Sequence, residues 1–414
     1  MEKRTICQGV NLNVIETNKY KDISIFIYFF AQEDIKGKII KELLTYIIGN
    51  KTKKYNSKSS LRNIKDNLYG ASVNSGALNF GNSEVFQIYC KILNERFLNE
   101  QILDKFFDLI KEIINNSIID DDTVNEAKNH LIDKMLRRTD NVNHYSNSQS
   151  LNIYGENTYL YNSLIFDIND INQVNTQDVI NSYNKILKEN NIDIYVVGEV
   201  NSKCIYSYLN EIFNLKRVPT KFQIEPIKKR KFLAKYEEEK NITQTTLTML
   251  YKTNVYIDDF KQTVLKVINC YLGQGPASLL FQEVREKNNL CYSIFSYLHV
   301  TEDLLVVKTA INYKNYNKTI KIIDEQIDKL KSGNFDMKDV KSCLNLYINY
   351  LNGVEDDLSL YIKHKYTSSL LKVDKEIDDI INDMQKVTKQ DIIEVFSSVE
   401  FLFSHLLKGK NENE

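Results

Sequence analysis

The sequence VNTQDVI at residues 174–180 returns, with small changes, as VTKQDII at residues 387–393. Each copy opens a helical pattern, and each is followed by a strand pattern that ends in Gly198 or Gly409. The two copies are separated by between about 210 and 225 residues of sequence. This separation is too long for a solenoid repeat and is typical of a duplicated domain. Two further pairs keep a similar separation: LLTYIIG (43–49) with VINCYLG (267–273), and NLYGAS (67–72) with NLCYSI (289–294).

The segments around these repeats predict the fold class. ISIFIYFF at 23–30 is a continuous run of aromatic and β-branched residues, which predicts a strand buried on both faces. In KGKIIKELLTYIIGN at 36–50 the apolar residues recur at helical spacing, and Gly49 stands where a helix C-cap is expected. We therefore expect an α+β protein made of two tandem homologous α/β domains, each with a mostly antiparallel sheet packed with helices. Further strands are expected at 85–93 and 192–198, and helices at 98–115, 122–138 and 176–188.

A charged segment separates the two copies. KRVPTKFQIEPIKKRKFLAKYEEEK at 216–240 holds two of the three prolines, and its basic run is followed directly by an acidic one. This composition is typical of a linker, and a chain of 414 residues suits two domains of about 200 residues. We expect an N-terminal domain at 1–218 and a C-terminal domain at 219–414. The basic run is alternatively a nucleic-acid patch, which we disfavour because the following glutamates neutralise it.

Charge and cysteine usage exclude several classes of partner. The 54 basic and 55 acidic residues leave a net charge of -1, so no global field draws the chain to nucleic acid or to an anionic membrane. No apolar run is long enough for a membrane span, and the N-terminus lacks the apolar core of a secretory signal. The six cysteines are scattered without a Cys-x-x-Cys pair, which is typical of a reducing compartment. We expect a cytoplasmic protein with neither a nucleic-acid nor a membrane partner.

Several common catalytic motifs are absent. The loop that begins Gly273-Gln-Gly275 lacks the third glycine of a dinucleotide fingerprint and the Lys of a phosphate loop, and it follows a helix rather than a strand. No Gly-x-Ser-x-Gly elbow occurs either. No two of the five histidines have the close spacing of a zinc motif, and the most metal-like of them, His130 near Glu126 and Asp133, fits a solvated helix face better.

The stretch GQGPASLLFQEVREKNNLCYSIFSY at 273–297 carries a family resemblance. It is similar to the second-domain signature of the pitrilysin or insulinase superfamily, the M16-type zinc peptidases, whose members carry tandem α/β domains related by duplication. The resemblance covers nearly the whole chain. The Asp-x-Leu-Tyr-Gly-Ala at 66–71 resembles the short bacterial subunits that lack the zinc motif and that act in pairs, similar to the mitochondrial processing peptidase.

The resemblance also implies that the metal site has been lost. Active relatives carry His-x-x-Glu-His on the first long helix, and the three critical positions here hold Glu42, Thr45 and Tyr46. Neither Thr nor Tyr replaces a neutral imidazole ligand or a water-activating glutamate at that spacing. The downstream carboxylate pair of the family falls near Glu126 and Asp133. We therefore expect no metal and no other cofactor in this chain, with zinc held by a partner subunit.

The other half of the family's active site is retained. The resemblance implies that Arg285 and Tyr292, seven residues apart, reach the substrate as catalytic residues in trans. An arginine offers fixed charged donors to peptide carbonyls, and a tyrosine hydroxyl can donate to a developing oxyanion. Taken alone, Arg285 also fits a solvated helix residue and Tyr292 a core aromatic. Gly273 and Gly275 are expected to form a mobile substrate-binding loop, or alternatively a turn between two helices.

Together these features predict a metal-free, catalytically degenerate subunit of a heterodimeric M16-type zinc metallopeptidase that acts on peptides. Its partner is a homologous subunit with the His-x-x-Glu-His motif, and the chain alone is inactive. An extended peptide binds by adding a strand to a sheet edge of the catalytic subunit. The alternatives are a non-catalytic peptide-binding clamp or a homodimeric scaffold. A purely structural role, like that of the core subunits of the respiratory bc1 complex, is disfavoured because no membrane partner is indicated.

Overall fold

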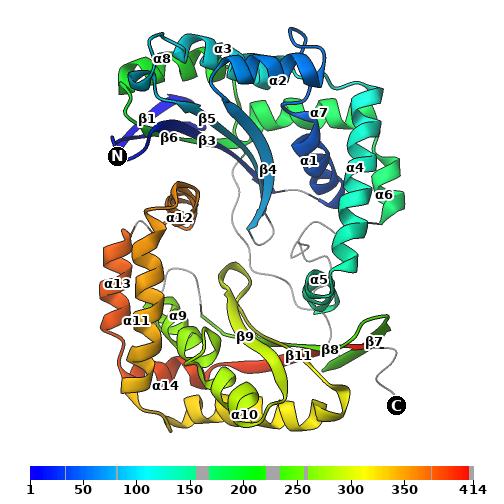
Figure 1. The fold of residues 1–414 in the computed structure, drawn as a ribbon, viewed down its shortest axis with the longest axis vertical. Helices are drawn as coiled ribbons and strands as arrows, with labels where there is room; N and C mark the ends of the chain where they lie inside the picture. The colour runs from blue at the N-terminus through cyan, green and yellow to red at the C-terminus, as the bar shows by residue number, and fades with distance from the viewer. Residues whose placement is uncertain are drawn as a thin grey trace. The chain divides into compact units, whose positions relative to one another are not determined.

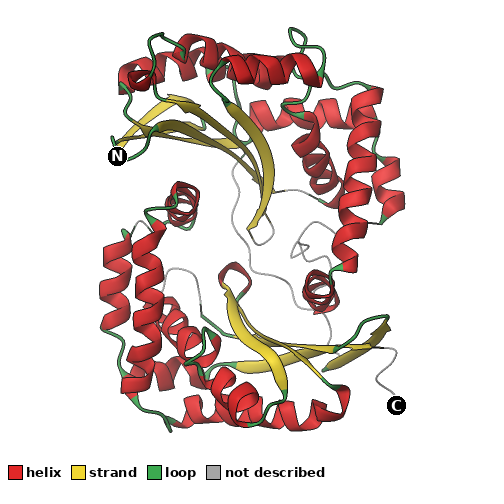
Figure 2. Ribbon diagram, in the orientation of Figure 1, coloured by secondary structure: helices red, strands yellow, loops and turns green. Residues whose placement is uncertain are grey.

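The computed structural model describes residues 1–32, 34–80, 83–154, 167–220, 234–255, 260–373 and 375–409. The chain divides into two compact units. The first comprises Met1–Arg138 with Tyr161–Glu225, and the second comprises Thr139–Leu160 with Pro226–Glu414. Each unit contains one mixed sheet packed with helices, as Figure 2 shows. The expected α+β class is therefore confirmed.

The sheet of the first unit has the order β1-β2-β6-β3-β5-β4 (Figure 1). Only β2 and β6 pair in parallel, whereas the other neighbours are antiparallel. β4 stands at one edge, where it pairs with β5 alone among the described strands. The strands are β1 Glu2–Cys7, β2 Val10–Glu16, β3 Asp22–Gln32, β4 Ser72–Phe80, β5 Ser83–Leu93 and β6 Asn191–Gly198.

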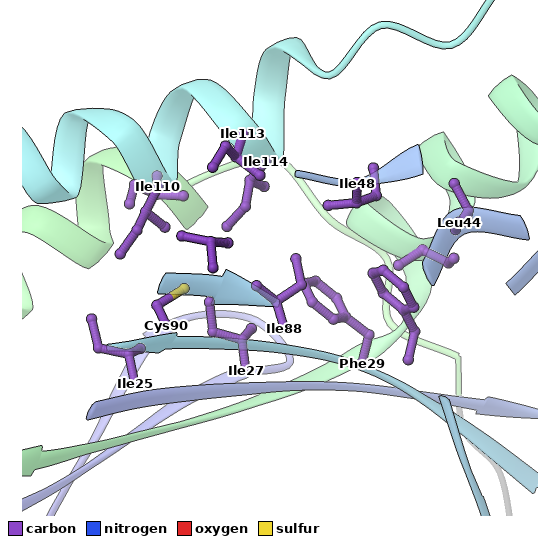
Figure 3. Close-up of a cluster of buried hydrophobic side chains, with 14 of the residues drawn as sticks. Ile25, Ile27, Phe29, Leu44, Ile48, Ile88, Cys90, Ile110, Ile113 and Ile114 are labelled. Carbon is purple, nitrogen blue, oxygen red and sulfur yellow. The ribbon is translucent and has the colours of Figure 1, made fainter. Parts of the chain in front are cut away.

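β3 contains the predicted strand at 23–30 and is buried on both faces. Ile25, Ile27 and Phe29 point to the helical side, where they join Ile88 and the isoleucines of α3 (Figure 3). Successive side chains of a strand alternate between faces, so Phe26 and Tyr28 lie on the other side. The continuous apolar run is therefore explained by burial on both faces rather than by one amphipathic face.

Seven helices of the first unit lie in the described ranges, and the three predicted at 98–115, 122–138 and 176–188 are among them. The first of these begins later than expected, because the Glu95 carboxylate accepts from the backbone N–H groups of Ile102 and Leu103 and so caps the helix there. The helices are α1 Ile35–Ile47, α2 Lys58–Asn67, α3 Leu103–Asn116, α4 Asp121–Asp140, α6 Ile168–Gln173, α7 Thr176–Glu189 and α8 Ser202–Phe213, with a short 3₁₀ turn η1 at Glu95–Phe97.

The sheet of the second unit repeats the order of five of these six strands, and the described residues include no counterpart of β1. Its order is β7-β11-β8-β10-β9, and only β7 and β11 pair in parallel, as β2 and β6 do in the first unit. β9 is an edge strand that pairs with β10. The strands are β7 Lys235–Lys240, β8 Thr245–Lys252, β9 Cys291–His299, β10 Leu304–Ile311 and β11 Glu400–Gly409.

Helices α9, α10 and α14 lie on one side of this second sheet (Figure 1). The helical elements that follow β8 are α9 Phe260–Gly273, η2 Phe281–Lys287, η3 Val300–Glu302, η4 Tyr313–Asn315, α10 Tyr316–Ser332, α11 Met337–Val354, α12 Leu358–Leu370, α13 Ile377–Gln385 and α14 Lys389–Ser397. None of the helices in the described ranges is long and apolar enough to cross a membrane.

The repeated sequence motif forms the same local structure twice. Asn175 and Asp178 make a capping box at the start of α7, and Thr388 and Asp391 make one at the start of α14. In each box the cap side chain and the third helical residue accept from each other's backbone N–H groups, which satisfies two otherwise unpaired donors. α7 then leads into β6 and α14 into β11, at equivalent places in the two sheets. The motif therefore fixes where both helices begin.

Helix α5 (Val142–Tyr154) comes from the first half of the sequence but belongs to the second unit. It covers the face of the second sheet opposite α10 and α14 (Figure 1). Its polar side chains dock there: Ser146 Oγ lies 3.1 Å from Thr248 Oγ1, and Tyr145 donates to Glu238 at 3.1 Å. A single boundary near residue 218 therefore does not describe the packing units, because α5 packs with the second one.

The predicted linker at 216–240 is partly built into the two units. The buried Arg217 guanidinium donates to the carbonyl oxygens of Gln8, Leu187 and Asn190, which ties this residue to the first unit. At the other end, residues 235–240 form β7 rather than a linker. The middle of the predicted linker, 221–233, lies outside the described residues.

Candidate functional site

The first candidate site lies around α1, which carries the three positions aligned with the zinc motif. The helix forms here because Asp34 caps it, accepting from the Gly37 N–H at 2.8 Å, and because its apolar side chains enter the core. Glu42 is buried, and its carboxylate lies 2.9 Å from Lys134 Nζ of α4. Thr45 Oγ1 donates back to the Glu42 carbonyl at 2.7 Å. Both side chains are therefore engaged within the protein.

Tyr46, the third position, belongs to a second cluster. The Lys58 ammonium donates to the Tyr46 hydroxyl at 2.8 Å and to the Glu126 carboxylate at 2.9 Å, and lies 5.0 Å from the centre of the Tyr46 ring. Lys51 Nζ lies 3.7 Å from the other Glu126 oxygen. The His130 ring packs against the Tyr46 ring at a tilt of 30°, with ring centres 4.6 Å apart. The Glu126 carboxylate and the Tyr46 phenol thus share Lys58 as a partner, and the imidazole adjoins the phenol.

The charges in this cluster shift each other's protonation in the expected directions. Hydrogen bonds to Glu126 and to Tyr46 raise the pKa of Lys58 above its usual value. The hydrogen bond from Lys58 in turn holds the pKa of Glu126 below its usual value. Both groups therefore stay charged at neutral pH, and each stabilises the charge of the other.

These residues do not fit zinc. A zinc site needs three or four converging imidazole, thiolate or carboxylate ligands. Within the described ranges, no group of three or more His, Cys, Asp or Glu side chains is placed to hold a metal ion. The fourth position named from the family pattern, Asp133, is exposed on α4. Glu126 is paired instead with the ammonium groups of Lys58 and Lys51.

The second candidate site is the Arg285 and Tyr292 pair, which the structure brings together. The Arg285 guanidinium lies 4.5 Å from the centre of the Phe281 ring and 5.3 Å from that of Tyr292, so it makes cation–π contacts with both. Its Nε also lies 3.5 Å from a Glu286 oxygen. Tyr292 is 79% exposed, so the alternative interpretation as a core aromatic is wrong.

Local backbone structure explains how the pair is placed. Arg285 lies on η2, a short π-helical segment, and Asn289 then adopts a left-handed conformation with φ 51° that ends it. Asparagine tolerates this region better than most residues. The N–H of Leu290 returns to the Val284 carbonyl at 3.0 Å, and β9 begins at the next residue. The tight reversal sets Tyr292 at the start of an edge strand beside the helix end that carries Arg285.

The two glycines predicted to bind substrate have different environments. Gly273 ends α9 and is buried: a Cβ there would lie 2.6 Å from the backbone nitrogen of Ser296 in β9. Gly275 is exposed, has φ +86°, and would meet nothing within 4 Å. Gly273 is thus required for close packing of helix on strand, and Gly275 for a left-handed turn. Of the two, only Gly275 lies on the surface where a ligand has access.

Lys58 and Lys51 were not predicted from the sequence. Lys58 is the first residue of α2, and Glu126 lies on α4, so no local spacing links them. One indirect signal was present. A lysine at a helix N-terminus faces the positive end of the helix dipole and needs a compensating anion. Which carboxylate supplies it depends on the tertiary fold.

Comparison with known proteins identifies the fold and its relatives. Residues 173–347 match the family described as Peptidase M16 inactive domain. The chain is 24% identical over 413 residues to the "Probable inactive metalloprotease YmfF" of Bacillus subtilis (strain 168), covering 97% of this chain and 96% of that protein. A conserved protein from Enterococcus faecalis V583 superposes with a TM-score of 0.90 at 24% identity, over 100% of this chain and 99% of that one. A peptidase M16 inactive domain from Pseudomonas fluorescens gives a TM-score of 0.79 at 13% identity, over 98% and 97%.

Proposed function

Because the chain belongs to the M16 peptidase superfamily as an inactive, metalloprotease-like member, we propose that it is the substrate-binding subunit of a two-subunit peptidase. A homologous partner with an intact His-x-x-Glu-His motif supplies the metal centre. This chain supplies Arg285 and Tyr292. The partner and the peptide substrate are inferred from the family resemblance together with the geometry of the two candidate sites.

The observation that carries this proposal is the contrast between the two sites. In the first unit, Glu42, Tyr46 and Glu126 have lysine partners, and no ligand set for zinc is present in the described ranges. In the second, Tyr292 is 79% exposed beside a guanidinium. An exposed tyrosine and arginine in contact form a site that can meet a ligand from outside the chain.

The chemistry of the pair suits a peptide. A guanidinium presents several fixed N–H donors, and a peptide offers a carbonyl oxygen at every residue. The Tyr292 hydroxyl can donate a hydrogen bond to an oxygen that gains negative charge as water adds to the scissile carbonyl. When bound in the partner, zinc activates that water and polarises the carbonyl. The role of this chain is to hold the peptide and to stabilise charge through a positioned donor.

The peptide is expected to bind in an extended form. Both sheets end in edge strands, β4 and β9, and an edge strand offers unpaired backbone groups to an added strand. We place the added strand on the partner's sheet, with Tyr292 approaching it from this chain.

A cytoplasmic location is part of the proposal, because none of the six cysteines is in a disulfide.

The test is steady-state cleavage by the mixed subunits, with complex formation checked by gel filtration. Tyr292→Phe should lower turnover on the order of a hundredfold while assembly is kept, since it removes the hydroxyl and keeps the ring; loss of an oxyanion donor costs roughly 2.7–4 kcal/mol. Arg285→Ala should weaken substrate binding as well as turnover, because a charged donor acts before and during the reaction.

The matched control is Arg62→Ala. Arg62 is exposed on α2, the counterpart in the first unit of the helical segment that carries Arg285, and its removal should change neither rate nor binding. Unchanged rates in both Arg285→Ala and Tyr292→Phe would contradict the proposal. Peptide binding by the chain alone, with unchanged turnover in the mixture, would instead identify a non-catalytic clamp.

A further inference from the structure

The cluster around Lys58 points to an inference that does not depend on the proposed function. Glu126 and Tyr46 come from different helices, and both contact one ammonium group, at 2.9 and 2.8 Å. We infer that Lys58 is a built-in surface cation that takes the place of a metal ion at Glu126 and disfavours the binding of divalent metals there. Lys58 thus supplies positive charge at Glu126 without a metal ion.

The position of Lys58 is fixed by the start of α2. Ser57 caps this helix: its hydroxyl accepts from the Ser60 N–H at 3.1 Å, while Ser60 Oγ accepts from the Ser57 N–H at 3.2 Å. Lys58 is therefore held at the first helical position. A cation there is disfavoured by the helix dipole, and the Glu126 carboxylate compensates for it. The lysine and the carboxylate are thus suited to each other.

The Glu126 carboxylate and the Tyr46 hydroxyl, two groups of the cluster that could coordinate a metal, already have ammonium partners. One Glu126 oxygen lies 2.9 Å from Lys58 Nζ and the other 3.7 Å from Lys51 Nζ. The Tyr46 hydroxyl accepts from Lys58, and the His130 ring packs against the Tyr46 ring in a tilted arrangement. A divalent cation that approached Glu126 would have to displace two ammonium groups of its own sign. Replacing ligands alone should therefore not create a metal site.

The experiment restores the motif with and without Lys58. The triple variant Glu42→His, Thr45→Glu, Tyr46→His is made with Lys58 intact and again with Lys58→Met. Zinc sulfate is the probe, and bound zinc is measured by elemental analysis after gel filtration and by calorimetry. We expect about one zinc per chain when Lys58 is replaced, and binding at least tenfold weaker when it is intact, because the ammonium competes for Glu126.

Lys54→Met is the matched control. Lys54 is an exposed lysine close in sequence whose ammonium lies over the Tyr55 ring at 5.4 Å, and replacing it in the triple variant should leave zinc binding as weak as before. Equal zinc affinity with and without Lys58 would overturn the inference, as would zinc binding that is strengthened by Lys54→Met as much as by Lys58→Met.

Should the triple variant fail to fold, the single variant Tyr46→His, which changes one half-buried residue, is compared with and without Lys58→Met. Zinc retained by that variant with Lys58 intact overturns the inference, and zinc retained only after Lys58→Met supports it.

Discussion

The five strands of the second sheet repeat the order of five of the six strands in the first, yet the polar residues of the two units are arranged in opposite ways. In the first unit, Lys58, Glu126 and Tyr46 satisfy one another at the surface. In the second, Arg285 and Tyr292 lie together with the tyrosine largely exposed. The duplicated scaffold therefore does not dictate the chemistry at equivalent places. It holds side chains in position, and the identity of those side chains decides whether a cluster is closed or open to a ligand.

A second contrast concerns the faces of the sheets that lie opposite their main helical cores. The first sheet carries aromatic residues there: Phe26 stacks on Tyr89 with ring centres 4.6 Å apart, and Tyr28 meets Tyr195 edge to face. The second sheet carries polar residues beneath α5, among them Lys308 and His405. Burial of these groups is tolerated because Lys308 Nζ and His405 Nε2 each have a hydrogen-bond partner, and this ties the stability of the second face to protonation.

The largest expected effect tests whether the two units unfold separately. Phe29 is fully buried in the first core, where it contacts the rings of Phe86 and Phe213. Phe29→Ala should lower the free energy of unfolding of the first unit by about 3–5 kcal/mol, through lost burial and the cavity that remains. Hydrogen exchange measured separately on β5 and β10 distinguishes the units, and we expect loss of protection in β5 only.

The matched control for this change is Phe401→Ala in the second unit. Phe401 is 46% exposed and contacts the Tyr251 ring at one edge, so its removal should cost less than about 1 kcal/mol. Equal loss of protection in β5 and β10 after Phe29→Ala would show that the two units unfold as one.

Much of the fold was predictable because it rests on local signals. The run at 23–30 predicted β3, and the repeated capping motif at 174–180 and 387–393 predicted α7 and α14. These predictions hold because hydrophobic periodicity and helix capping each depend on residues only a few positions apart. Helix α5 was not predicted as part of the second unit. Its sequence is mostly polar, and the sheet on which it packs is decided by the burial of Leu151 against that sheet and by contacts with residues about a hundred positions away.

The candidate sites likewise divide into residues that local sequence signals predict and residues that only the tertiary fold brings together. Arg285 and Tyr292 were predicted as a pair and do meet, because one tight turn brings η2 onto β9. Lys58 was not predicted, because its partner Glu126 is 68 positions away in sequence on another helix. The catalytic and substrate-binding roles assigned to these residues stay predictions.

The next effect uses the polar face beneath α5. Lys308 is buried on β10, its ammonium donates to the Asn143 carbonyl of α5 at 2.5 Å, and burial lowers its pKa to about 8 from 10.5. Between those two pH values the unfolded chain binds more protons than the folded one, so the free energy of unfolding rises with pH. Relative to Lys308→Met, the wild type should gain on the order of 2 kcal/mol between pH 7 and 10.

Urea unfolding of both proteins at pH 7, 8.5 and 10 measures this difference. Both chains share all other titrating groups, so these largely cancel in the comparison. Parallel pH profiles for the wild type and Lys308→Met would mean that the lysine keeps an ordinary pKa in the folded state and is hydrated. A difference that grows toward low pH in favour of the wild type would reverse the sign and contradict the burial argument.

The smallest expected effect compares the repeated caps directly. Asn175→Ala and Thr388→Ala each remove a side chain that accepts from a backbone N–H at the start of α7 or α14. Each should lower the free energy of unfolding of its own unit by about 1 kcal/mol, whereas replacement by glycine should cost only a few tenths, since glycine is itself a tolerated cap. Hydrogen exchange in β6 reports the first change and in β11 the second. Because both caps are built in the same way, we expect the two alanine effects to agree within about 0.5 kcal/mol. A cost confined to one unit would show that the other cap is dispensable despite its geometry, and that the shared sequence motif does not carry equal weight in the two halves.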